Sequence, residues 1–392
     1  MMESKKLLNS VLDDLQLGIN FKISIQEQNH ANPTKKKIEA LIGANNGFNI
    51  NIINGRFDEA SSSLPKGVSV LKPSKVNNKE LKACLSKSKN SMISVNHDLA
   101  KNGFTLKCNR ADKVQDVYVN YINTFEDSFF NQMRNNYIFG QDCRINISER
   151  FFSANGFYKP QVNNIVSEIS LEKNAQVKIL STGKMCCHHE SKNYLSSFIS
   201  QKHGSSFCYF NIGLNVNWSK NYTNIVLCEE GAKCNLYSAE CLNNSQFSEN
   251  DIFINHSAPE CASKQVYKGV FSDKSTSSFN SCVHVSRDAQ KTLAVQQNNN
   301  MILSDYAMVK SNPQLEIFAD DVECAHGSTF GQLDKDALFY LQARGLKKSL
   351  AQKMLVKAFI IDVFEKIEHK AFEKDLLHSL DQKIQSLSES KI

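Results

Sequence analysis

The sequence of 392 residues has no long hydrophobic segment and contains one tryptophan and six prolines. No stretch reaches the roughly 18 consecutive apolar residues that a membrane-spanning helix needs. Residues 1–20 carry Asp13 and Asp14 among spaced leucines, so they lack the apolar core of a secretory signal. These absences predict a protein that neither crosses a membrane nor is exported, and we expect it in the cytoplasm.

Motifs of nucleotide-dependent and hydrolytic enzymes are also missing. Gly183-Lys184 has neither the upstream glycine nor the following Ser or Thr of a phosphate-binding loop. The sequence contains no GxGxxG segment after a strand, no HExxH and no GxSxG. We therefore expect no catalytic residues of these classes, and any ATP used in the same process would bind another subunit.

The charge distribution and the cysteines bear on nucleic-acid binding and on the redox state of the thiols. The net charge of +6 is spread over the chain, and its densest patch, Lys35-Lys36-Lys37, is typical of a solvated helix face. No groove-reading or base-stacking motif accompanies the charge, so we expect no binding to nucleic acid. The 12 cysteines form no tight framework, which predicts reduced thiols that are mostly buried.

Three regions differ in their pattern. Residues 1–133 are mixed: leucines at helical spacing predict a helix near the N-terminus, Asn54-Gly55 predicts a tight turn between short strands, and Leu64-Pro65-Lys66-Gly67 another turn. Residues 134–330 are rich in short β-type segments. Those segments are residues 144–147, 165–171, 176–180, 207–214, 224–227, 282–285 and 315–319.

One recurring pattern favours a solenoid over a sandwich or a barrel. A turn residue followed by alanine occurs at Ala175, Ala232, Ala289 and Ala307. The first three alanines are 57 residues apart and the fourth follows after 18, so both spacings fit coils of about 18 to 19 residues. Intermediate coils lack the alanine, which leaves chance recurrence as the alternative. We predict a parallel β-helix, with the Asn-rich segment 296–300 as a turn outside the stack.

Residues 331–392 show helical patterns. Asp334 is placed to cap a helix that Gly345 would end, and Ser349 and Gln352 have the spacing of a capping box for a second helix. The second helix should pack an apolar stripe against the solenoid or a partner. The stripe consists of Ala351, Met354, Leu355, Ala358, Ile361 and Phe364.

Two groups of residues could bind a metal. Cys324 and His326 are two positions apart, so in a strand they would point to the same face and could share a metal or a cluster. Two ligands do not complete a four-coordinate site, and the alternative is a buried Cys beside a satisfied His. In the run Cys186-Cys187-His188-His189-Glu190 adjacent residues would face opposite sides of a strand. Neither side then has enough ligands alone, so a coincidental cluster is the favoured interpretation.

The stretch from Phe279 to Gly345 resembles the C-terminal signature of the SufB/SufD family of iron–sulfur cluster assembly proteins. The Cys-x-His-Gly form at Cys324 resembles the SufD branch, because SufB-like sequences tend to have a Glu-His-Glu type segment there. Departures from the family are Cys282, where a basic residue is more frequent, and the Cys186–His189 run. The matching positions are 279–280, 288–292, 297, 303–304 and 316–322, with 258–261, 265 and 267–269 upstream and 53–57 near the N-terminus.

The resemblance implies a mainly β protein, with a right-handed parallel β-helix between an N-terminal mixed region and C-terminal helices. It implies a non-catalytic accessory scaffold that meets SufB through the β-helix and docks the SufC ATPase. No cofactor would be tightly bound; a transient iron–sulfur cluster or iron would be shared with SufB, with His326 as ligand and Cys324 beside it. Our candidates for the contact with SufC are Leu338, Phe339, Met354, Leu355 and Phe359.

Two other functions remain open at this point. Parallel β-helices also occur in polysaccharide-active enzymes, whose carboxylates line an outer groove, and Asp320-Asp321 are adjacent acids. The missing export signal and the many free cysteines argue against that function. The chain could also be a SufB-like primary scaffold that acts without a distinct SufD.

Overall fold

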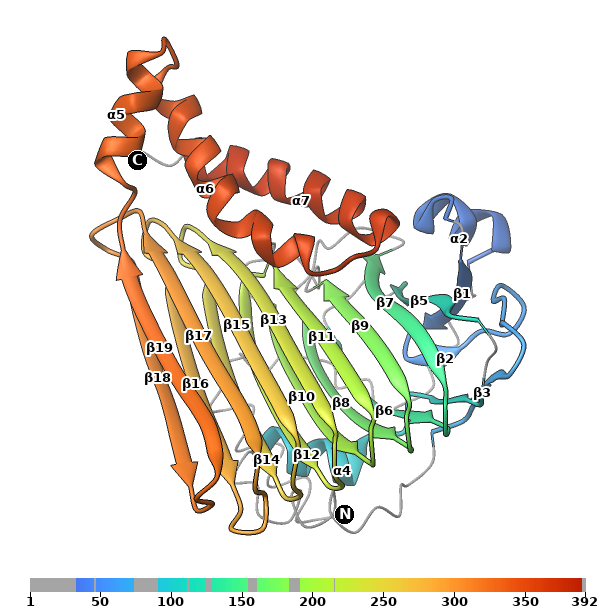
Figure 1. Cartoon of the computed structure of the whole chain (residues 1–392). Coiled ribbons are helices and arrows are strands. Elements are labelled where there is room, and N and C mark those ends of the chain that lie inside the picture. The colour runs from blue at the N-terminus through green and yellow to red at the C-terminus, as the bar shows by residue number, and fades with distance from the viewer. Residues whose placement is uncertain are drawn as a thin grey trace.

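The structure, a computed structural model, describes residues 33–45, 47–73, 91–110, 113–124, 129–153, 161–182, 191–214 and 216–389. Two stacked sheets form the body of the molecule, with helices along one side (Figure 1). The predicted helix within residues 1–20 and the Cys186–Glu190 run lie outside the described residues. No helix in the described ranges is long and apolar enough to cross a membrane.

From β4 onward, successive strands alternate between the two sheets, as a parallel β-solenoid requires. The nine-stranded sheet, here sheet A, contains in spatial order β3 (Val68–Leu71), β4 (Thr105–Cys108), β6 (Phe129–Phe139), β8 (Gln161–Leu171), β10 (Lys192–Gln201), β12 (Trp218–Leu227), β14 (Phe247–His256), β16 (Thr276–Val285) and β18 (Met308–Ile317). The ten-stranded sheet, here sheet B, contains β2 (Arg56–Phe57), β1 (Phe48–Ile53), β5 (Gln115–Asn123), β7 (Arg144–Ser153), β9 (Gln176–Thr182), β11 (Ser206–Gly213), β13 (Lys233–Leu242), β15 (Ala262–Phe271), β17 (Thr292–Ile302) and β19 (Val322–Gly331).

The predicted parallel β-helix is confirmed, but the predicted coil length is wrong. Each coil contains two strands, so Ser206 of β11 lies beside Gln176 of β9 and Lys233 of β13, which are 30 and 27 residues away. Ala175 and Ala232 are therefore two coils apart, and the corner of the coil between them is occupied by Ser205. Ala307 lies at the opposite corner, between β17 and β18, so its distance from Ala289 measures part of a coil.

The corners that lead from sheet A to sheet B repeat one backbone conformation. Asp142, Asn174, Gly204, Gly231 and Glu260 each have positive φ, between 57° and 73°. The residues that follow them are small and fully buried, and they are Cys143, Ala175, Ser205, Ala232 and Cys261. A small side chain fits the tight corner, while Asn, Asp and Gly tolerate the left-handed backbone before it.

Side chains alternate between the interior of the solenoid and its surface. In β17, Ala294 and Asn298 are buried between the sheets, whereas Leu293 and Val295 are exposed. The prediction that residues 296–300 form an outer turn is wrong, because all five lie in β17. Each of their interior amides makes at least one hydrogen bond: Gln296 Nε2 donates to Ser281 Oγ at 3.1 Å, and Asn300 Nδ2 donates to Asn298 Oδ1.

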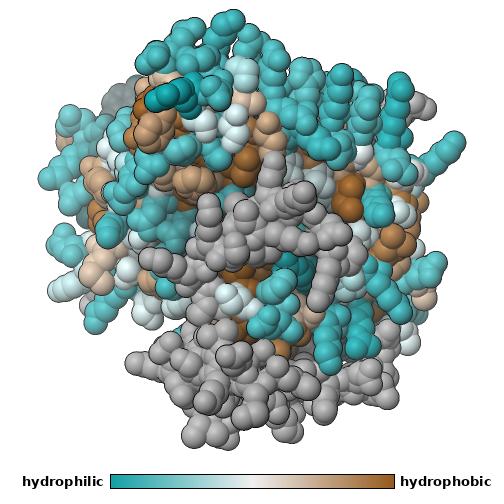
Figure 2. All heavy atoms as spheres, turned by 90° about the horizontal axis from the view of Figure 1, so that it is seen from below, coloured by the Kyte–Doolittle hydropathy of each residue, from teal (hydrophilic) through white to brown (hydrophobic). Residues whose placement is uncertain are grey.

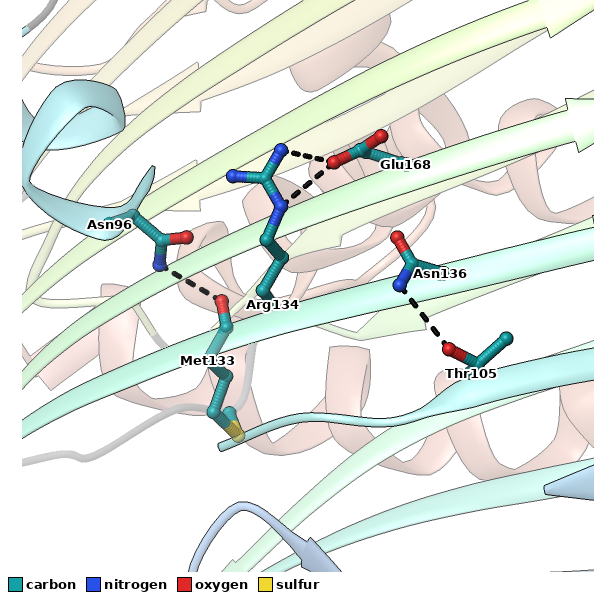
Figure 3. A network of polar contacts seen from close by, with 6 residues as sticks. All are labelled: Asn96, Thr105, Met133, Arg134, Asn136 and Glu168. Carbon is teal, nitrogen blue, oxygen red and sulfur yellow. Dashed lines mark hydrogen bonds and ion pairs between the residues drawn. The ribbon is translucent and has the colours of Figure 1, made fainter. Parts of the chain in front are cut away.

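A buried polar network joins α4 (Ser91–Leu99) to sheet A (Figure 3). Asn96 Nδ2 donates to the Met133 carbonyl at 3.0 Å and to the Asn164 carbonyl at 2.9 Å. On the neighbouring strands Arg134 pairs with Glu168, with 2.8 Å between Nε and Oε1. Asn96 therefore gives the helix a fixed position over β6 and β8.

The C-terminal helices lie at the C-terminal ends of the sheet B strands, where α6 and α7 pack on the outer face of the sheet (Figure 1). They are α5 (Lys335–Ala343), α6 (Lys348–Glu365) and α7 (Lys370–Glu389). Apolar side chains of α6 and α7, such as Phe364 and Leu380, pack on outward-facing residues of sheet B, such as Phe210 and Cys241. Lys268 of β15 donates to the Phe359 carbonyl at 2.9 Å and fixes α6 on the sheet.

Several predicted helix features are confirmed and two are wrong. Asp334 caps α5 by accepting from the backbone of Asp336 and Ala337, and Gly345 has positive φ just after the helix. Ser349 is no cap, since α6 begins at Lys348 and its N-cap has no side-chain hydrogen bond. The predicted stripe is wrong for Met354 and Ala358, which are exposed, whereas Ala351 and Phe364 are buried as predicted. The buried residues of α6 are Ala351, Gln352, Val356, Ile360, Val363 and Phe364.

The N-terminal predictions are confirmed where the structure describes them. Asn54 and Gly55, both with positive φ, form the turn between β1 and β2, and Gly67 lies in the second predicted turn. Lys35, Lys36 and Lys37 are exposed on α2 (Lys35–Ile42). The sheets continue on the N-terminal side of residue 134, because β5 and β6 pair with β7 and β8. Seen from below, the coloured surface is largely hydrophilic with smaller hydrophobic patches (Figure 2).

Candidate functional site at the open end of the solenoid

The last coil, made of β18 and β19, leaves one end of the solenoid open (Figure 1). Each of these strands pairs on one side only, β18 with β16 and β19 with β17. The other side of each strand has unpaired backbone N–H and C=O groups among the described residues, which is the usual template for adding a strand. Both sheets therefore end in an unpaired edge at the same end of the solenoid.

Cys324 and His326 lie on this last coil, in β19. Cys324 is in register with Ala294 and His326 with Gln296, and both of these β17 residues point into the interior. The two side chains therefore share the interior-facing side of β19, about 6.6 Å apart along the strand. The prediction that they share one face of a strand is confirmed.

The two residues differ in exposure because the solenoid stops at this coil. Cys324 is half-buried and packs against the apolar core, together with Leu315 and Val322. Burial raises the pKa of the Cys324 thiol. His326 is exposed and lies farther along the strand. The face thus offers one soft thiol at the edge of the core and one imidazole that is accessible from outside.

Polar side chains continue the same face beyond His326. Ser328 Oγ donates to Asn298 Oδ1 at 3.2 Å and lies 2.9 Å from Ser311 Oγ of β18. This contact links the two edge strands across the open end. Within the described residues, no group of three or more His, Cys, Asp or Glu side chains is placed to hold a metal ion. Cys324 and His326 would therefore need ligands from another source to complete a site.

The five candidate contacts for an ATPase subunit lie on α5 and α6. Phe339 is 72% exposed and Met354 is 46% exposed, which is unusual for side chains of this size. Leu338 and Leu355 are half-buried. Phe359 is also half-buried, and the Lys268 ammonium lies over its ring at 4.8 Å, so this residue contributes to attaching α6.

The two adjacent acids Asp320 and Asp321 lie in the corner between β18 and β19. Both are exposed, and the backbone of Asp321 bonds with Gln290 and Lys291 of the preceding coil. These hydrogen bonds hold the corner between β18 and β19 against the corner of the preceding coil. Neither acid lines the groove on the outer face of sheet A that is described next.

Sequence reasoning missed a groove on the outer face of sheet A. Its volume is about 570 Å³, and its lining includes Asp251, Asn280, Cys282 and His284. His284 Nδ1 lies 3.1 Å from a carboxylate oxygen of Glu316. The alternation of Cys282 and His284 was visible in the sequence, but the side chains that surround them come from three neighbouring strands.

Comparison with known proteins places these features in a family. The family model described as "SUF system FeS cluster assembly, SufBD core domain" matches residues 121–359, more than half of the chain. The iron–sulfur cluster assembly protein SufD of Escherichia coli is 36% identical over 132 residues, 34% of this chain and 31% of that protein.

Two further relatives match over longer stretches. An iron–sulfur cluster assembly SufBD family protein of Synechocystis is 33% identical over 211 residues, 53% of this chain and 46% of that protein. The chloroplastic protein ABCI7 of Arabidopsis thaliana is 29% identical over 233 residues, 58% of this chain and 47% of that protein. In all three cases the match covers less than half of the relative.

Proposed function

Since the chain belongs to the SufBD core family of the SUF iron–sulfur cluster assembly system, we propose that it is a non-catalytic accessory scaffold, the SufD-like subunit of a SufB–SufC–SufD complex. The observation that carries the proposal is the position of Cys324 and His326. Both lie on the interior-facing side of the last coil, beside the edge where the strands β18 and β19 have no further partner strand in the described residues.

The open end is the proposed contact with SufB. Unpaired strand edges favour the addition of strands from a second β-solenoid, because the backbone groups of both chains are then satisfied. Such a partner would cover His326 and would supply the ligands that Cys324 and His326 cannot supply alone. The iron–sulfur cluster is the cargo of this interface, and no cofactor is tightly bound.

The exposed faces of α5 and α6 are the proposed contact with the SufC ATPase. Phe339 of α5 and Met354 of α6 present large apolar surface to the solvent; other residues of α6 pack on the solenoid, and α5 contacts α6. ATP hydrolysis would take place in SufC, and the helices would transmit the resulting movement to the solenoid end. This assignment leaves the present chain without a catalytic residue.

Substitution His326→Ala tests the ligand role. Because His326 is exposed and packs on no core residue, the variant should fold and assemble with its partners as the wild type does. We expect the iron and acid-labile sulfide bound per complex to fall by about tenfold or more, as loss of a ligand implies. A matched control is His284→Ala, which removes an imidazole from the outer face of sheet A instead of the open end.

A normal iron and sulfide content in the assembled His326→Ala complex would remove His326 from the site. Failure of the variant to assemble would show an interface role instead. Substitution Cys324→Ser should have a smaller effect than His326→Ala, because its thiol is half-buried against the core.

A further inference from the structure

Two buried cysteines meet at the opposite end of the solenoid from Cys324 and His326. Cys108 ends β4, and Cys143 lies in the corner between β6 and β7. Their side chains are 1% and 0% exposed, and the two Sγ atoms are 2.8 Å apart. This is a contact between two thiols that come from successive coils.

The backbone holds the two sulfur atoms together. Cys108 pairs in register with Phe139, the last residue of β6, and the chain then turns back at once. Gly140 N donates to the Cys108 carbonyl at 2.8 Å, and Cys143 N donates to the Gly140 carbonyl at 3.1 Å. The backbone therefore directs the Cys143 side chain onto Cys108 at the end of β4. The two sulfur atoms are in contact without any change in the fold.

The same corner exists in later coils, but among the described residues no other coil places two thiols there. Cys143 is equivalent to Ala175 and Ser205, while Cys108 is equivalent to Phe139 and Leu171. The repeated geometry of the solenoid therefore brings the corner residue of each coil close to the strand end of the preceding coil. At this coil both positions are cysteines, so two thiols meet.

We propose that Cys108 and Cys143 are a dithiol–disulfide site that reacts with glutathione disulfide and staples the first complete corner of the solenoid to strand β4. The site is independent of the proposed function at β19. It is reached through the end of sheet A, where β4 is covered by β3, an edge strand of four residues. Short edge elements open locally more readily than central ones.

The reaction is a thiol–disulfide exchange in two steps. The Cys143 thiol donates to the Cys108 sulfur, which lowers the pKa of Cys108 and raises the pKa of Cys143. Cys108 is therefore the attacking thiolate: it bonds to one glutathione sulfur and releases the first glutathione. Cys143 then loses its proton, attacks the Cys108 sulfur and releases the second glutathione. Two protein thiols become one disulfide, and one glutathione disulfide becomes two thiols.

Refolding of the full chain in a glutathione buffer tests the proposal, because the oxidant then reaches the site before burial. After alkylation of the remaining thiols and digestion, the Cys108 and Cys143 peptides should appear cross-linked in the wild type. The cross-link should be absent in Cys143→Ser. It should persist in Cys261→Ser, which changes an equally buried cysteine at an equivalent corner.

A second measurement separates a staple from an accidental cross-link. Closing this loop should lower the equilibrium constant for unfolding by about thirtyfold to several hundredfold in the oxidised wild type, and the Cys108→Ser variant should show no change with oxidant. Full alkylation of both cysteines after oxidative refolding would overturn the proposal. A cross-link that leaves the unfolding midpoint unchanged or lowered would overturn the stapling role.

Discussion

At the scale of single residues, the interior of the solenoid contains buried polar groups, and at His256 it disfavours the charged form of the side chain. This residue is fully buried in β14, in register between Leu227 of β12 and Val285 of β16. Its Nε2 lies 2.8 Å from Ser263 Oγ, and burial lowers the pKa of the imidazole to about 4. The folded state therefore favours neutral His256. Its contribution to stability is complete above about pH 6.5 and is lost as the pH falls toward 4.

The variant His256→Gln tests this dependence, because glutamine can keep a polar contact with Ser263 and has no proton to gain. Between about pH 7 and about pH 4.5, the wild type should lose about 2.5 kcal/mol of unfolding free energy that the variant keeps. Urea unfolding at both pH values measures the difference. The control His284→Gln, at a partly exposed residue paired with Glu316, should behave as the wild type does. Identical pH dependence of His256→Gln and wild type would contradict the assignment.

At the scale of elements, α6 explains why sequence periodicity identified the helix and chose the wrong face. The helix is apolar on most sides, so the stripe through Met354 and Ala358 fits the helical repeat as well as the observed stripe through Val356 and Ile360. Its rotation is fixed by tertiary contacts, since Lys268 bonds both the Phe359 carbonyl and the Asp362 carboxylate. The spacing of apolar residues within one helix contains no information about these contacts.

The two faces of α6 should respond differently to truncation. Phe364→Ala removes a fully buried ring and should lower the unfolding free energy by about 3–5 kcal/mol. Met354→Ala and Phe339→Ala remove exposed side chains and should change it by less than about 0.5 kcal/mol. If these side chains dock the ATPase subunit, the double variant should be captured less well by immobilised SufC while its unfolding midpoint stays unchanged. Undiminished capture would move the docking surface elsewhere.

At the scale of the whole molecule, the sequence predicted the solenoid but not where its coils begin and end. The alanine signal is present at Ala175 and Ala232 and is replaced by Ser205 and Cys261 in other coils, so the apparent period was not the true one. The alternation of side chains along a strand was sufficient to predict that Cys324 and His326 share one face. The position of this face on the last coil depends on how many coils stack. A local sequence pattern does not determine that number.

The end of the stack also gathers exposed apolar side chains, and this carries a last prediction. Met308 is 64% exposed and Phe330 is 51% exposed, and they lie on the two edge strands β18 and β19. If a second β-solenoid covers this end, charges at both positions would be buried without a partner, at a high cost in free energy. Met308→Glu with Phe330→Glu should therefore abolish co-purification with SufB in size-exclusion chromatography.

The matched control is Leu71→Glu with Val114→Glu. These two residues are 50% and 54% exposed, similar to Met308 and Phe330, but they lie outside the last coil. This control variant should bind SufB as the wild type does, and both variants should unfold at the wild-type midpoint, because all four side chains face solvent in the isolated chain. A complex that forms equally well with Met308→Glu and Phe330→Glu would show that the partner binds another surface. In that case the open end would remain uncovered, and Cys324 and His326 could not share a cluster with SufB.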